Sequence, residues 1–278
     1  MIRRKNPFSI VAAVFVLLPF FIVSCETTES AASGESAGAR IKNIPLEDVM
    51  SESSGRLWTT VPEDGNPVFL GVADNMFYDE NEKEAALQDA ALYAALYYYL
   101  DGETGFLEYR KGQFTYLDVK YMKSMVPEIQ ERLEVLDTYQ DTEGTVLLAK
   151  LAGTSAPSYG YNPVPEGRSG SEKPSWIATI PEIPGFLVSV GVADKRSTLK
   201  QSILAADKQA LSEMLRQLSL KTKAGRLEQD TDIGQVEKSA TSQVAKAELQ
   251  GMYILARWHS DNGKYFYSLG VCPESNRK

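Results

Sequence analysis

The residue types that most often carry out catalysis are scarce in this chain of 278 residues. The only histidine is His259, and the only cysteines are Cys25 and Cys272. A Ser-His-Asp triad would need His259 beside a nucleophile and an acid, and no Gly-x-Ser-x-Gly elbow is present. Gly71 and Gly191 stand alone rather than in a dinucleotide-binding set, and no Walker pattern occurs. We therefore predict no catalytic residue and no cofactor, and we interpret His259 as a surface or turn-flanking side chain.

Cys25 follows a segment with the features of a secretory signal peptide. Arg3, Arg4 and Lys5 form a positive start, residues 8–23 are almost wholly apolar, and a small residue directly precedes the cysteine. An uncleaved membrane anchor is the alternative, but a span needs about 20 apolar residues. This run is shorter and contains a proline. The pattern predicts a signal peptide over residues 1–24.

The small residue directly before Cys25 resembles the lipobox of bacterial lipoproteins. The resemblance implies that Cys25 is the lipid attachment site and the mature N-terminus, so that the chain is anchored to the cell membrane or the outer membrane. Several acyl chains would anchor it firmly, whereas a single chain binds only marginally. The remaining chain would then lie in the periplasm or at the cell surface. Which membrane and which face are involved stays open.

Lipidation of Cys25 would leave Cys272 without a disulfide partner. One histidine and one free cysteine are too few for a zinc site, which takes three or four ligands. Two acidic clusters could bind calcium, but they lack the fixed spacing and glycine of a calcium loop, and acids at a helix start also suit its dipole. These clusters are Asp79, Glu80, Glu82 and Glu84, and Glu228, Asp230 and Asp232. We predict that the protein holds no metal.

The net charge is −8, and removal of the three basic residues of the signal leaves 26 basic against 37 acidic residues, a charge of −11. Such a chain repels phosphate backbones, so we predict no nucleic-acid partner. It also repels anionic lipids, so its membrane attachment must come from covalent lipid.

Two stretches have the composition of loops. Residues 25–56 are rich in serine, threonine, glutamate, glycine and alanine, which predicts a flexible tether. Residues 154–174 contain four prolines and three glycines, which predicts a linker between domains. The expected modules are residues 57–153 and 175–278.

The two modules repeat the same landmarks in the same order. Each begins with a tryptophan followed by Pro-Glu, continues with a Gly-Val-Ala-Asp strand end and an alanine-rich helix, and closes with a hairpin. The matched residues are Trp58 and Trp176, Gly71 and Gly191 at an offset of 120, Ala90 and Ala206, Ala94 and Ala210, and Gly144 and Gly263 at an offset of 119. Four landmarks at nearly constant spacing indicate a tandem duplication.

The residue pattern predicts strand, long helix and hairpin in each copy. In the second copy we expect a strand over 186–193, a helix capped by Ser197, a weaker polar helix between 220 and 252, and a hairpin over 253–271 around Asn262-Gly263. In the first copy we expect a longer loop over 75–83, a helix over 85–100 and a hairpin over 133–151. For residues 102–126 two alternatives stay open, an extra hairpin around Lys111-Gly112 and a helix from Leu117 onward.

These motifs resemble the Lpp-twenty lipoprotein family and are similar to the N-terminal domain of flagellar assembly protein T. The resemblance implies an α+β fold of two tandem modules, each with a long helix packed on a three-stranded antiparallel sheet in a dodecin-like arrangement. No catalytic residues are associated with that family. The resemblance therefore implies an interaction role in the cell envelope, with envelope proteins or further copies of the chain as partners.

Four tyrosines on the first expected helix are candidate binding residues, namely Tyr93, Tyr97, Tyr98 and Tyr99. They could pack in the core, or they could form a docking surface, since tyrosine is enriched at interfaces. We predict a non-enzymatic interaction or structural module, and the alternative is a small-molecule or glycan-binding lipoprotein that uses this aromatic surface. A deep polar pocket would favour the alternative, and an exposed apolar face shared between the modules would favour a protein partner.

Overall fold

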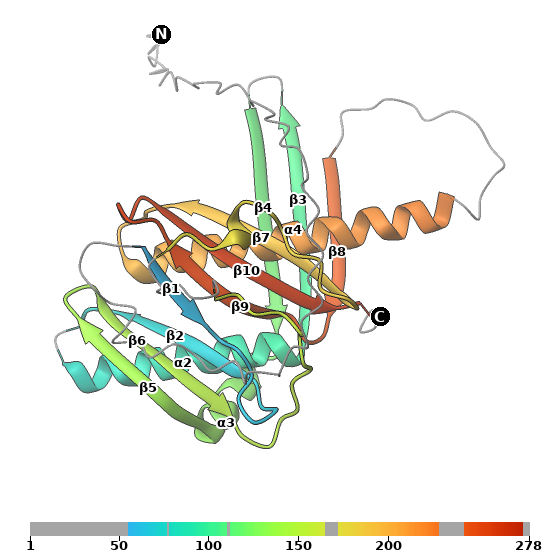
Figure 1. The fold of residues 1–278 in the computed structure, drawn as a ribbon. Helices are drawn as coiled ribbons and strands as arrows, with labels where there is room; N and C mark the ends of the chain where they lie inside the picture. The colour runs from blue at the N-terminus through green and yellow to red at the C-terminus, as the bar shows by residue number, and fades with distance from the viewer. Residues whose placement is uncertain (1–54, 77, 110–111, 165–171, 228–241, 275–278) are drawn as a thin grey trace, which may run out of the picture. The chain divides into compact units, whose positions relative to one another are not determined.

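A computed structural model describes residues 55–274 except 77, 110–111, 165–171 and 228–241. The fold is α+β, as predicted, with helices packed on antiparallel sheets (Figure 1). The helices of the described residues are α2 (Asp79–Tyr98), α3 (Val126–Arg132) and α4 (Leu199–Leu227), with short 3-10 turns η1 (Lys123–Met125) and η2 (Ser175–Ile177). None of the helices in this part of the chain combines the length and the apolar composition needed to span a bilayer.

Two sheets contain the predicted hairpins. One has the order β2 (Val68–Asp74), β6 (Gly144–Leu151), β5 (Leu133–Asp141), and α2 packs on β2 and β6. The other has the order β1 (Arg56–Thr59), β9 (Tyr253–His259), β10 (Tyr265–Pro273), β7 (Phe186–Asp194), and α4 packs on β7 and β10. The sequence of strand, helix and closing hairpin is therefore the same in both halves of the chain.

A glycine in each half lets the helix touch the strand beneath it. A Cβ atom on Gly71 would lie 1.9 Å from the carbonyl oxygen of Ala86, and one on Gly191 would lie 2.0 Å from that of Ala206. Ala86 and Ala206 are thus equivalent, at the same offset as the glycines. The predicted match of Ala90 with Ala206 is wrong by one helical turn.

The predicted longer loop in the first half is also wrong, because α2 begins at Asp79 and α4 at Leu199. Both connections from strand to helix therefore have the same length. The first turn of α2 is acidic, with Asp79, Glu80 and Glu82, where the dipole stabilises negative charge. The apolar stripe from which we inferred the helix start begins only after this turn.

The two strand-to-helix loops are held in the same way by different residues. In the first half the N–H of Met76 donates to Glu82 Oε1 (2.6 Å), and in the second the N–H of Arg196 donates to Ser202 Oγ (2.8 Å). The hydroxyl of Thr198 accepts the N–H of Gln201 (3.2 Å) at the start of α4. Thr198 is therefore the cap that we had placed one residue earlier, at Ser197.

A third sheet joins segments from both halves. Its order is β4 (Gly112–Tyr121), β3 (Leu100–Tyr109), β8 (Ser242–Leu249). The hairpin alternative for residues 102–126 is confirmed, and a helix from Leu117 is wrong because β4 continues to Tyr121. The polar helix expected between 220 and 252 is wrong over 242–249, where β8 pairs with β3. Residues 228–241 lie outside the described residues. A strand partner so distant in sequence cannot be seen in the local spacing of apolar residues.

The two halves are interlocked at several places. β1 belongs to the first half but pairs with β9 of the second. Trp58 of β1, Leu70 of β2 and Ile203 of α4 belong to one buried cluster. The predicted linker has no helix or strand over residues 154–164, yet its Tyr159 is buried and stacks on Tyr253, with ring centroids 5.5 Å apart. The first half therefore completes a sheet and a core of the second.

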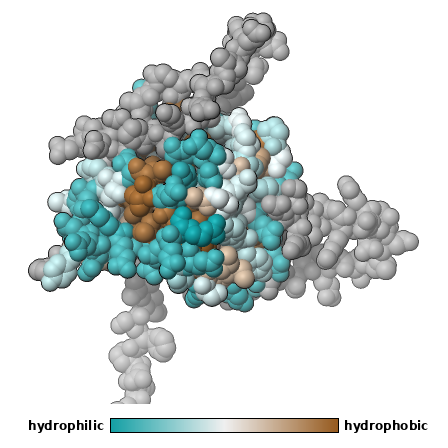
Figure 2. Space-filling view, turned by 90° about the horizontal axis from the view of Figure 1, so that it is seen from below, coloured by the Kyte–Doolittle hydropathy of each residue, from teal (hydrophilic) through white to brown (hydrophobic). Residues whose placement is uncertain are grey.

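The surface seen in Figure 2 is mostly hydrophilic, with one hydrophobic patch. Among the described residues, large hydrophobic side chains that are exposed are scattered over several elements. The exception is the pair Val135 and Leu136, which are 51% and 37% exposed and adjacent in β5. No strand of the described chain pairs with the outer edge of β5, whereas β1 covers the corresponding edge of β9.

Candidate functional site

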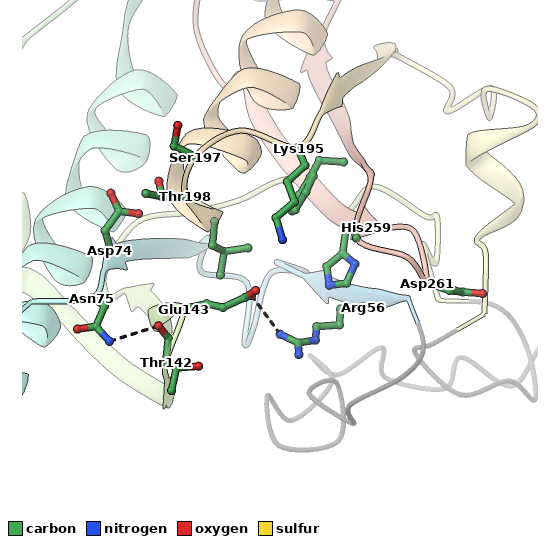
Figure 3. A pocket seen from close by; sticks show the side chains of 13 residues that line it. Arg56, Asp74, Asn75, Thr142, Glu143, Lys195, Ser197, Thr198, His259 and Asp261 are labelled. Atoms are coloured by element: carbon green, nitrogen blue, oxygen red, sulfur yellow. Dashed lines mark hydrogen bonds and ion pairs between the residues drawn. The ribbon is translucent and has the colours of Figure 1, made fainter.

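A cleft of about 440 Å³ lies where equivalent loops of the two halves meet (Figure 3). Each half contributes its strand-to-helix loop and its hairpin turn. Within each half, this loop and this turn lie together because the end of the strand before the helix pairs with the start of the last hairpin strand. Asp74 pairs with Gly144 in the first half, and Asp194 pairs with Tyr265 in the second. The lining residues are Asp74, Asn75, Thr142 and Glu143 from the first half, Lys195, Ser197, Thr198, Leu199, Asp261 and Gly263 from the second, and Arg56, His259 and Phe266 from the strands.

The basic groups of the cleft are Arg56 and Lys195. Arg56 Nη1 lies 3.8 Å from Glu143 Oε2 and 3.9 Å from Asp141 Oδ2. Both distances exceed hydrogen-bond length, and this buried nitrogen has no hydrogen-bond partner among the described residues. The side chain of Lys195 extends into the cleft in Figure 3. Within the described chain it forms no ion pair.

Asp74 supplies an acidic group on another side of the cleft. In Figure 3 it lies apart from Lys195 and His259. Asp74 Oδ1 is buried and has no hydrogen-bond partner in the described part of the chain. The neighbouring Asn75 is engaged, because its Nδ2 donates to the carbonyl oxygen of Thr142 (3.3 Å). The cleft thus contains one buried acceptor and one buried donor that the described residues leave without a hydrogen-bond partner.

His259 is buried in the wall of the cleft, with 8% of its surface exposed. It flanks the turn, as predicted, but the predicted surface position is wrong because β1 covers β9. Its ring packs near Trp58 and Phe266, at centroid distances of 5.5 and 5.4 Å. Burial lowers the pKa of His259, so the ring is neutral at pH 7. Nδ1 lies 2.8 Å from the carbonyl oxygen of Ser260. Because that oxygen can only accept, we assign the proton to Nδ1, which leaves Nε2 as an acceptor.

A second polar cluster is closed to solvent and holds the fold together. Asp207 of α4 pairs with Arg257 of β9 at 3.0 Å, and both side chains are buried. Asp207 also accepts hydrogen bonds from Tyr93 of α2 and Ser268 of β10. The guanidinium of Arg257 lies 4.8 Å from the centre of the Tyr93 ring. This cluster connects both helices to one sheet, and its burial makes it a structural element rather than a binding site.

The candidate tyrosines pack largely inside the protein. Tyr93 belongs to the buried cluster, and burial raises its pKa well above the ordinary value. Tyr97 is buried and donates to the carbonyl oxygen of Ser155 (3.1 Å), and the hydroxyl of Tyr98 lies 2.7 Å from that of Thr154. Tyr99 is half-buried. The structure favours the core-packing alternative for this set, because the segment after β6 folds back onto α2.

The remaining sequence candidates do not form a site in the described chain. Within residues 55–274 as described, no three histidine, cysteine or acidic side chains are placed to hold a metal ion. Cys272 is a buried thiol, as predicted. Cys25 and the acidic cluster formed by Glu228, Asp230 and Asp232 lie outside the described residues.

Sequence reasoning missed the residues that line the cleft. A signal was present in the repeated landmarks, because Asp74-Asn75 and Asp194-Lys195 follow the matched glycines at the same spacing in the two halves. A neutral amide in one loop and a cation in the other mark a point where the copies differ in charge. No protein-family model matches the chain, and neither a curated protein nor a solved structure matches it. The functional assignment therefore depends on the sequence signals and the geometry of the cleft.

Proposed function

We propose that this chain is a lipid-anchored binding protein of the bacterial cell envelope that takes a small polar ligand in the cleft and catalyses no reaction. The observation that carries the binding role is the pair of unsatisfied buried groups, Arg56 Nη1 and Asp74 Oδ1. Buried polar groups in proteins are nearly always hydrogen-bonded, and exceptions need an explanation. A ligand that supplies both partners is such an explanation.

The envelope location rests on the signal peptide and Cys25. A binding role without catalysis is supported by the surroundings of His259. Its ring lies near Trp58 and Phe266, and no hydroxyl or thiol of the described residues is bonded to its Nε2. A nucleophile and its base normally lie within hydrogen-bond reach.

We also propose that each half is one copy of the dodecin-like unit of the Lpp-twenty family. Support comes from the shared strand order, the equal loops before α2 and α4, and the equivalent contacts of Gly71 and Gly191 with their helices. In this proposal β1 and the sheet formed by β3, β4 and β8 are additions that connect the copies.

A protein partner is the second candidate function, and one observation favours it. The outer edge of β5 is free of strands in the described chain and carries the exposed pair Val135 and Leu136. The bulge between Val135 and Asp137 interrupts that edge, and bulges and charges are the usual protection against strand addition. We therefore rank this candidate below ligand binding.

Replacement of Cys25 by serine tests the anchor. Cells that express the wild-type protein in the presence of radioactive palmitate should label it, and the Cys25→Ser variant should lose both the label and its association with membranes. Cys272→Ser is the matched control, since it removes the other, buried thiol and should keep the label. If the Cys25→Ser variant still takes up palmitate and stays with membranes, the anchor proposal is wrong.

A thermal-shift screen of amino acids, sugars and phosphates tests the binding role. At a concentration 100-fold above its Kd a ligand stabilises the folded state by about 2.7 kcal/mol. That corresponds to a rise in Tm of about 5 to 10 °C for a chain of this size. We expect at least one class to produce such a rise with the full-length protein in detergent. If no class shifts Tm at millimolar concentration, the ligand-binding role is wrong.

A further inference from the structure

The cleft contains two charges of opposite sign that the described residues leave with neither an ion pair nor a hydrogen bond. The guanidinium of Arg56 has Glu143 and Asp141 within 4 Å. The carboxylate of Asp261 accepts the N–H of Gly55 (2.7 Å). Among the charged side chains that line the cleft, this leaves the carboxylate of Asp74 and the ammonium group of Lys195, neither of which forms an ion pair in the described chain.

These two charges lie apart in the cleft, with Lys195 toward His259 and Asp74 away from both (Figure 3). They come from equivalent loops of the two halves. In the first loop the position after the aspartate is Asn75, and in the second it is Lys195. Of the two uncompensated charges, the acidic one therefore comes from the first half and the basic one from the second.

This polarity limits the class of ligand. A simple anion would leave the carboxylate of Asp74 uncompensated, and a simple cation would leave the ammonium group of Lys195 uncompensated. A neutral polyol would leave both unpaired charges uncompensated. A ligand that carries an ammonium group and a carboxylate compensates both, and ion pairs with such hydrogen bonds are the strong ones.

We propose that the cleft binds a small zwitterion, namely a free α-amino acid. This inference rests on the proposed ligand-binding role. The ammonium group of the ligand donates to the carboxylate of Asp74, and its carboxylate accepts from Lys195 and from Arg56 Nη1. The side chain of the ligand lies against Leu199 and Phe266, the apolar residues that line the cleft. The volume of about 440 Å³ falls within the usual range for small-molecule sites.

Calorimetric titration of the full-length protein in detergent tests the proposal. Each of the common L-amino acids is titrated singly, and the tightest binder is then compared with its N-acetyl form, which lacks the ammonium charge, and its amide, which lacks the carboxylate. The free amino acid is expected to bind, and each blocked form is expected to bind at least 10-fold more weakly.

Two variants connect each end of the ligand to its residue. Lys195→Met should weaken binding of the free amino acid at least 10-fold and leave binding of its amide unchanged. Asp74→Asn should also weaken binding of the free amino acid at least 10-fold, and it should leave binding of the N-acetyl form unchanged. Lys208→Met is the matched control, because Lys208 is an exposed lysine of α4 outside the cleft, and it should bind like the wild type. Unchanged Tm values of the unliganded variants establish that they fold.

The outcomes separate this inference from the proposed function. Binding of sugars or phosphates without binding of any amino acid overturns the zwitterion and leaves the binding role standing. No binding by any class overturns both. Equal affinity for the free and N-acetyl forms overturns the pairing with Asp74, and with it the zwitterion. Loss of binding in Lys208→Met equal to that in Lys195→Met overturns the assignment of the carboxylate to Lys195.

Discussion

Replacement of Gly191 by alanine is expected to lower the free energy of unfolding by about 3 kcal/mol, the upper end for an overpacked interior. The new Cβ would lie 2.0 Å from the carbonyl oxygen of Ala206 and 2.3 Å from the amide nitrogen of Ala210. Both atoms belong to the backbone of α4, so a change of side-chain rotamer cannot relieve the clash. The helix would have to move away from β7 and β10, which would open the contacts beneath it. Urea denaturation followed by circular dichroism measures the loss.

The neighbouring Val192 provides the control on the same strand. Its side chain is 48% exposed, and Val192→Ala is expected to change stability by no more than about 0.5 kcal/mol, as is usual for a surface substitution. Gly71→Ala should behave like Gly191→Ala, because its Cβ would lie 1.9 Å from the carbonyl oxygen of Ala86. A denaturation midpoint of Gly191→Ala equal to that of Val192→Ala would contradict the close contact between helix and strand.

The second large effect is expected from the buried ion pair between α4 and β9. Asp207→Asn keeps the size of the side chain but leaves the guanidinium of Arg257 buried without a counter-charge. Removal of one partner of a buried pair costs about 3–5 kcal/mol. The loss of stability should be seen as a lower urea midpoint. The substitution also weakens the contact between α2 and α4, since Tyr93 donates a hydrogen bond to the same carboxylate.

Glu213→Gln is the matched control for Asp207→Asn. It also removes one negative charge from α4, but Glu213 pairs with the exposed Arg216, and pairs of that kind contribute about 0–1 kcal/mol. The double variant Asp207→Leu with Arg257→Met should recover part of the loss, since apolar replacement of a whole buried pair is often neutral or stabilising. If Asp207→Asn and Glu213→Gln lower the free energy of unfolding equally, burial of the ion pair does not determine how much the pair stabilises the fold.

The end of the predicted tether lies at the cleft. The described chain begins at Gly55, whose N–H is held by Asp261, a residue that lines the cleft. Arg56, the next residue, lines the same cleft. Gly55 and Arg56 are the last two residues of the tether proposed over 25–56, so the proposed tether joins the folded part of the chain at the cleft.

By itself the sequence determined the closing hairpins, the long helices and their common order in the two halves. Those features depend on local periodicity and on turn residues such as Gly263, which has a φ of 62°. The start of α2 was mistaken because its acidic first turn is stabilised by the helix dipole, which leaves no apolar spacing to read.

Only the tertiary structure decided how the halves are joined and where the cleft lies. The partners in those contacts are far apart in the chain: the hydroxyl of Thr60 donates to the carbonyl oxygen of Ile254, 194 residues away, and β3 pairs with β8. Such pairing depends on which sheet edges remain open after each half has folded, and no local pattern records that. The same holds for Asp74 and Lys195, whose charges share a cleft only because the interlocked sheets bring equivalent loops of both halves together.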